Sequence, residues 1–220
     1  MQQRRPVDWV VFDVGETLVD ETRQWGWWAD ELGVPRLTFF ALLGAVVVAG
    51  RPYTDVFGYF RPDFDPAAAR ARRAAAGGPS TIGSDDLYPD ALPTLAALRA
   101  AGYGLAAMAN QPLEVAEFLG QLPVDARATS AQWGVAKPDA RFFDRVAETV
   151  GAPPGRIAYV GDRVDNDVLP ARRAGMLAVH VRRGPWGYLH ADLPEAAAAH
   201  LRLDGLDGLL PGLAELATLG

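Results

Sequence analysis

The sequence contains no cysteine, which excludes disulfide bonds, thiolate nucleophiles and zinc sites built from sulfur ligands. No apolar run reaches the roughly 18 residues that suggest a membrane-spanning helix, and the most apolar stretch, at 39–50, is better explained as a buried helix. No apolar segment follows the two arginines near the N-terminus, so the pattern of a secretory signal is missing as well. We therefore expect a cytoplasmic protein.

The chain also lacks the excess of positive charge that is typical of nucleic-acid-binding proteins. Its formal net charge is −6, and its one basic stretch, at 66–78, is typical of the solvated face of an alanine-rich helix. We expect a small molecule as partner, with neither nucleic acid nor membrane, and a homodimer is compatible with the sequence. What remains is an ordinary globular composition of 220 residues, enough for one large core and an insertion.

Strand and helix patterns alternate along most of the chain. Short apolar segments predict strands at 7–14, 103–110, 156–162 and 177–183. Periodic apolar residues predict helices at 91–101, 112–122, 139–150, 165–175 and 205–216. Asp90 is expected to cap the first of these helices. Strands that are apolar throughout, with helices between them, indicate an α/β fold with a parallel sheet covered on both faces.

One long segment, between the first strand and the helix at 91–101, shows no clear strand. It carries helical patterns at 21–33, 36–50, 52–60 and 66–76, and a turn-rich stretch then leads back. The pattern predicts an all-helical insertion directly after the first strand. We expect residues 1–19 and 87–220 to form the α/β core, and residues 20–86 to form the helical insertion.

Polar side chains stand where the predicted strands end. Asp13 ends the first strand, Asn110 the second and Asp162 the third, while Lys137 lies in a loop just before a helix. Ligands of open parallel sheets bind beyond the carboxyl ends of the strands, so we expect these side chains to share one rim. Carboxylates gathered there would repel each other unless a cation joined them, and oxygen ligands suit Mg²⁺. An ammonium group beside Mg²⁺ suits a phosphoryl group.

These residues occur in four motifs that resemble those of the haloacid dehalogenase-like superfamily of hydrolases, most of which are phosphatases. The motifs are VVFDVGETL with Asp13 and Thr17, LAAMAN with Asn110, KPD with Lys137, and GDRVDNDVLPARRAGM with Asp162 and Asp167. Each motif alone is weak, but four of them in this order and structural context are specific. The resemblance covers nearly the whole chain. It implies a Rossmann-like core with a small helical cap after the first strand, as in subfamily I.

The resemblance also implies a reaction and its residues. Asp13 would attack phosphorus and form an aspartyl-phosphate, which water would then hydrolyse. Thr17 would brace the loop of the nucleophile, and Lys137 would neutralise the phosphate, with Asn110 beside it. The cap would exclude water and select a small phosphorylated metabolite. The implied ligands of Mg²⁺ are Asp13, the backbone carbonyl of Gly15, Asp162 and Asp167.

Two residues depart from the family pattern. Gly15 stands where the phosphatases carry a second aspartate, which protonates the leaving group and later activates water. Ala109 stands where a phosphate-binding hydroxyl is expected, and Asn110 would replace it in part. General acid–base catalysis is worth about two to four powers of ten, so the loss at Gly15 would lower activity unless it is compensated. Glu16, a cap residue or water would be a substitute, whereas an acyl phosphate would need no acid.

Three functions fit these residues. The first is a Mg²⁺-dependent phosphohydrolase. The second is a metal-independent hydrolase of the 2-haloacid dehalogenase type, a branch that also lacks the second aspartate. The third is a catalytically weakened binding protein of the same fold. Retention of Asp162 and Asp167, which make most sense as metal ligands, favours the first. An apolar substrate, as in the second, would suit the aromatic residues of the cap: Trp25, Trp27, Trp28, Phe39 and Phe40.

Overall fold

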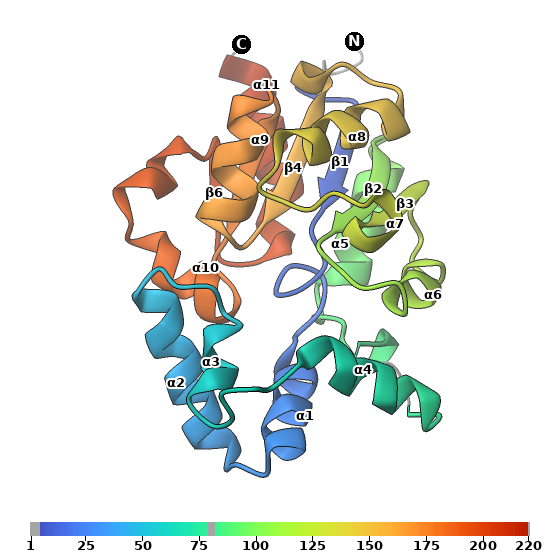
Figure 1. The fold of residues 1–220 in the computed structure, drawn as a ribbon. Coiled ribbons are helices and arrows are strands. Elements are labelled where there is room, and N and C mark those ends of the chain that lie inside the picture. The colour runs from blue at the N-terminus through green and yellow to red at the C-terminus, as the bar shows by residue number, and fades with distance from the viewer. Residues whose placement is uncertain (1–4, 79–81, 220) are drawn as a thin grey trace. The chain divides into compact units, whose positions relative to one another are not determined.

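The computed structural model describes residues 5–78 and 82–219. The chain forms two compact units, one made of Met1–Asp20 with Leu87–Gly220 and the other of Glu21–Asp86 (Figure 1). The first unit contains a six-stranded parallel sheet with the strand order β3-β2-β1-β4-β5-β6. Its strands are β1 (Trp9–Phe12), β2 (Gly104–Ala109), β3 (Ala126–Thr129), β4 (Ile157–Gly161), β5 (Leu177–Val181) and β6 (Leu201–Leu203).

The register of the central strands brings their carboxyl ends to one edge. Phe12, the last residue of β1, lies opposite Ala107 of β2 and Val160 of β4. The chain leaves all three strands within a few residues of this row, so the polar side chains that follow them share one rim. Every residue of β4 is buried, as a strand covered on both faces requires.

Helices cover both faces of the sheet. The α-helices of this unit are α5 (Ala91–Ala100), α6 (Val115–Leu119), α7 (Ser130–Trp133), α8 (Ala140–Val150), α9 (Leu169–Arg173), α10 (Gly184–Ala191) and α11 (Leu209–Leu219). Shorter turns are η2 (Pro154–Arg156), η4 (Pro194–Ala198), η5 (Leu206–Gly208) and the π-helical turn η3 (Val164–Val168). In Figure 1, α8 and α9 lie in front of the sheet and α5 lies behind it.

The start and end of α8 follow from its sequence. The Asp139 side chain accepts a hydrogen bond from the backbone N–H of Arg141, and Gly151 ends the helix with φ +65°. The helix buries Phe142, Phe143 and Val146 against β-strand side chains. This packing fixes the helix that follows the Lys137 loop.

The second unit is helical and has an aromatic core. Its helices are α1 (Thr22–Leu32), α2 (Arg36–Val48), α3 (Asp55–Gly58) and α4 (Pro66–Ala75), with the turn η1 (Ser84–Asp86). The ring of Trp28 lies 5.0 Å from that of Phe57, and Phe39 packs 6.3 Å from Trp25. Trp28 and Phe39 are fully buried, so these rings act first as the core of this unit.

The predicted α/β fold with a parallel sheet is confirmed, whereas several details were wrong. The helix expected at 112–122 is reduced to α6, and the sequence did not predict β3, β6, α7 or α10. Asp90 makes no capping hydrogen bond to α5, because its carboxylate instead pairs with Arg183. Along the described residues no single helix is both long and apolar enough to cross a membrane. Helices α1 and α2 pass that test only jointly, across a bend of 110°.

Candidate active site

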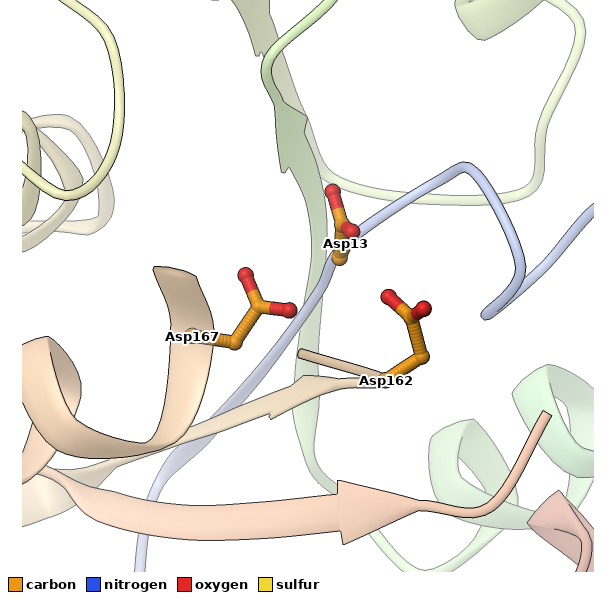
Figure 2. Close-up of side chains that lie close together, drawn as sticks. All are labelled: Asp13, Asp162 and Asp167. Carbon is orange, nitrogen blue, oxygen red and sulfur yellow. The ribbon is translucent and has the colours of Figure 1, made fainter. Parts of the chain in front are cut away.

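Three buried carboxylates converge at the rim of the sheet. Asp13 follows β1, and its N–H donates to the carbonyl of Val160, 2.8 Å away. Asp162 follows β4, and Asp167 lies on the π-helical turn η3. Figure 2 shows the three carboxylates pointing toward one another, and one oxygen atom of each lies within 4.8 Å of those of the others. Segments far apart in the sequence thus build one acidic cluster, defined here as Asp13, Asp162 and Asp167.

The glycine that ends β4 makes room for this cluster. A Cβ atom at Gly161 would lie 2.3 Å from Oδ2 of Asp167, so a side chain there would displace the carboxylate. Asp167 is held in place by the N–H of Arg163, which donates to Oδ2 at 3.0 Å. The GD pair of the fourth motif therefore supplies both the Asp162 carboxylate and the space for the Asp167 carboxylate.

Lys137 joins two members of the acidic cluster. Its Nζ lies 2.7 Å from Oδ1 of Asp13 and 2.6 Å from Oδ1 of Asp167, and the side chain is buried. Burial acts to lower the pKa of this ammonium, but the attraction of Asp13 and Asp167 prevails, so the pKa lies well above its ordinary value. Lys137 is therefore a fixed positive charge at the site.

Asn110 positions the loop that carries Lys137. Its Nδ2 donates to the carbonyl of Lys137 at 2.9 Å, and its Oδ1 accepts from the N–H of Lys137 at 2.8 Å. The side chain that we expected to replace the missing hydroxyl at Ala109 is thus engaged with backbone. Asn110 links the end of β2 to Lys137, and any contact of its own with phosphate stays a prediction.

The charges at the site call for a cation. Three carboxylates and one ammonium leave a net charge of −2 when all are ionised. Burial, followed by repulsion from Asp167 and Asp13, raises the pKa of Asp162 well above its ordinary value. Burial and repulsion from Asp13 also raise the pKa of Asp167 to about 6, although Lys137 acts against the shift. Burial and mutual repulsion both disfavour the ionised carboxylates, and a divalent ion that joined them would offset both effects.

The donor set fits Mg²⁺. All three side chains of the acidic cluster offer carboxylate oxygens, which hard cations prefer. Within the part of the chain that the structure describes, no lysine or arginine pairs with the Asp162 carboxylate, in contrast to Asp13 and Asp167. Asp162 is therefore the member of the acidic cluster whose negative charge a bound cation would offset most.

The loop after Asp13 places the remaining predicted residues. Gly15 forms a β-bridge with Val19, and the Thr17 hydroxyl is buried without a hydrogen-bond partner among the described residues. Glu16 is buried outside the acidic cluster, where its Oε2 accepts a hydrogen bond from the Tyr88 hydroxyl at 2.5 Å. The loop thus brings Gly15 and Thr17 beside the end of β1, while the Glu16 carboxylate accepts the hydrogen bond from Tyr88.

Two further residues lie beside the predicted site residues: Tyr159 was not singled out from the sequence, and His180 was expected only as a packed or edge side chain of its strand. The Tyr159 hydroxyl donates to the carbonyl of Met108 at 2.7 Å, and Nζ of Lys137 lies 5.3 Å from the Tyr159 ring centre. His180 lies opposite Gly161 on the next strand, and its Nε2 is 2.9 Å from the carbonyl oxygen of Asp162. The parallel register was the signal for His180, since it sets that residue beside the end of β4.

Comparison with known proteins finds a family whose sequence model matches most of the chain. Residues 7–175 match the sequence model described as haloacid dehalogenase-like hydrolase. A glyceraldehyde 3-phosphate phosphatase of Methanopyrus kandleri is 35% identical over 109 residues, which are 45% of this chain and 45% of that protein. The chain thus spans about half the length of the curated relatives it matches.

Solved structures are similar over almost the whole chain. A HAD (haloacid dehalogenase) phosphatase from Thermococcus onnurineus is 25% identical with a TM-score of 0.57, over 93% of this chain and 97% of that one. The structure of a dehalogenase with an intermediate complex has a TM-score of 0.66 over 96% of this chain and 99% of that one. Its 20% identity supports the fold alone.

Proposed function

Because the chain belongs to the haloacid dehalogenase-like hydrolases, we propose that it is a Mg²⁺-dependent phosphohydrolase acting on a small phosphorylated metabolite through an aspartyl-phosphate on Asp13. The observation that carries the proposal is the buried acidic cluster with Lys137 bonded to two of its members. The similarity to a glyceraldehyde 3-phosphate phosphatase supports phosphate esters as the substrate class. A cytoplasmic location and a homodimer stay predictions from the sequence.

In this proposal each residue of the site has a defined task. Asp13, Asp162, Asp167 and the backbone carbonyl of Gly15 hold Mg²⁺. When bound, the ion supplies charge neutralisation and polarises the phosphoryl oxygens. A carboxylate oxygen of Asp13 forms a bond to phosphorus as the bond to the leaving oxygen breaks, and water then cleaves the aspartyl-phosphate. Lys137, already 2.7 Å from Asp13, orients the nucleophile and offsets negative charge on the phosphoryl group.

The substitution at Gly15 sets the preferred leaving group. Glycine has no side chain to donate a proton, and the nearby Glu16 carboxylate accepts a hydrogen bond from Tyr88. Without an acid at this position, leaving groups that depart as stable anions, such as carboxylates and phenolates, should be expelled most readily. We therefore propose that acyl and aryl phosphates are turned over faster than alkyl phosphates.

A pair of assays tests the proposed function. With Mg²⁺ and an aryl phosphate, we expect release of inorganic phosphate that Asp13→Asn abolishes. Asp144→Asn, on the exposed face of α8, is the matched control and should leave the rate unchanged. Halide release from 2-haloacids without metal would instead support the dehalogenase alternative. Absence of both activities in the folded protein would leave the third possibility, a binding protein.

A further inference from the structure

Glu16 has a backbone conformation that is unusual for its residue type. Its φ is +51°, in the left-handed region, where a side chain is unfavourable and glycine is usual. The glycine of this loop, Gly15, is the preceding residue and is not among those with positive φ. A residue held in such a conformation at a candidate active site points to a functional constraint on its side chain.

The contacts of the Glu16 side chain define that constraint. Its Oε2 accepts from the Tyr88 hydroxyl at 2.5 Å, in a partly buried position. Its Cγ lies so close to Gly184 that a Cβ atom there would be 2.4 Å away. Gly184 itself has φ +57°. Tyr88 and Gly184, both remote from Glu16 in the sequence, therefore accommodate its side chain.

Arg183 connects these segments to one another. Its guanidinium lies 4.2 Å from the centre of the Tyr88 ring, and its Nη1 donates to the carbonyl of Thr17 at 2.9 Å. Its Nη2 pairs with Oδ2 of Asp90, which also accepts from the N–H of Leu206 at 2.8 Å. The chain leaving β5 thus binds both the loop after Asp13 and the segment before α5.

Glu16 and Tyr88 lie near the two points at which the chain passes from one unit to the other. The boundaries lie after Asp20 and before Leu87. Within the first unit, Val19 forms a β-bridge with Leu87, and the N–H of Tyr88 donates to the carbonyl of Leu18 at 2.9 Å. The hydrogen bond between Glu16 and Tyr88 therefore joins the segment just before the first boundary to the segment just after the second.

We propose that Glu16 is a positioning residue, and that with Tyr88, Arg183 and Asp90 it forms a latch that holds the loop of Asp13 and Gly15 in its metal-binding shape. This inference rests on the proposed function. The latch uses Glu16 as a hydrogen-bond acceptor, whereas a substitute acid would use it as a proton donor. Glutamine keeps the acceptor and removes the proton, so the two roles predict different behaviour for Glu16→Gln.

The test measures Mg²⁺ affinity by calorimetry and kcat and KM on an aryl phosphate. We expect Glu16→Ala and Tyr88→Phe each to weaken Mg²⁺ binding about tenfold and to lower kcat more than they raise KM. The double variant should be no worse than either single one, because the two groups act as one unit. Glu16→Gln should recover most of the affinity that Glu16→Ala loses. The exposed Tyr188, which packs under Arg182, gives the matched control Tyr188→Phe.

A further variant separates folding from positioning. Glu16→Gly removes the side chain and the backbone strain together, so it should melt at a higher temperature than Glu16→Ala yet bind Mg²⁺ no better. Unchanged Mg²⁺ affinity in Tyr88→Phe would overturn the latch alone, as would a loss in Glu16→Gln equal to that in Glu16→Ala. Failure of the unaltered protein to bind Mg²⁺ would overturn the latch and the proposed function together.

Discussion

Replacing Gly15 with aspartate would place a proton donor at the position where the family pattern described above has an aspartate. Gly15 is not among the glycines with positive φ, so a side chain there introduces no left-handed strain. General acid–base catalysis contributes about 10²- to 10⁴-fold, or about 3–5 kcal/mol of barrier. We therefore expect Gly15→Asp to raise kcat/KM by about 10²-fold or more where the leaving group needs a proton.

Electrostatic repulsion sets the limit of this gain. The new carboxylate would lie near the acidic cluster, and one like charge about 6 Å away costs about 3 kcal/mol at an effective dielectric constant of about 20. Bound Mg²⁺ would cancel the net charge of −2 from the three carboxylates and Lys137. The penalty should therefore fall mainly on the metal-free protein, which we expect to unfold more readily than the unaltered one.

The assay compares alkyl and aryl phosphates at saturating Mg²⁺, with Gly15→Asn as the control of equal shape. Gly15→Asp should accelerate alkyl phosphates strongly and aryl phosphates with acidic phenols little, since the latter leave without a proton. Gly15→Asn should accelerate neither. Equal changes for both substrate classes, or equal effects of Asp and Asn, would refute the reasoning that a general acid is what this site lacks.

Three further predictions concern the metal-free site and its geometry. The pKa of Asp167 is raised from 3.8 to about 6, chiefly by burial, so the stability that its protonated form gives is present below about pH 4 and is lost as the pH rises through about 6. Urea unfolding without metal should show this fall, and Asp167→Asn or added Mg²⁺ should reduce it. Lys137→Met leaves two buried carboxylates unpaired and should lower the free energy of unfolding by about 3–5 kcal/mol, measured by denaturant titration. Gly161→Ala displaces Asp167 and should weaken Mg²⁺ binding in calorimetry, whereas Gly155→Ala, where a Cβ meets nothing closer than 4.0 Å, should not.

The features that could be predicted from the sequence were those that depend on short local motifs. Asp13 after an apolar strand, the KPD of Lys137 and the GD of Asp162 each combine a local structure with a chemical group. A parallel sheet then brings them to one rim, which is why the acidic cluster and Lys137 were expected together. Strands β3 and β6 lie at the edges of the sheet and carry exposed arginines, so they lack the continuous apolar run of a buried strand.

The features that the sequence did not predict depend on tertiary contacts. Glu16 and Tyr88 are 72 positions apart, and Arg183 reaches the Thr17 carbonyl across 166 positions. Asp90 had the position and type of a helix cap, but Arg183 and the N–H of Leu206 engage its carboxylate instead. A local pattern cannot reveal such competition, because the rival partners come from remote segments.

Calorimetric titration of the protein with Mg²⁺, beside Asp162→Asn, tests most directly whether the acidic cluster is a metal site. The account predicts that the unaltered protein takes up Mg²⁺ at the acidic cluster, and that Asp162→Asn, folded and relieved of a buried negative charge, takes up none there. A folded protein that binds no Mg²⁺, or one whose binding is unaffected by Asp162→Asn, would contradict it.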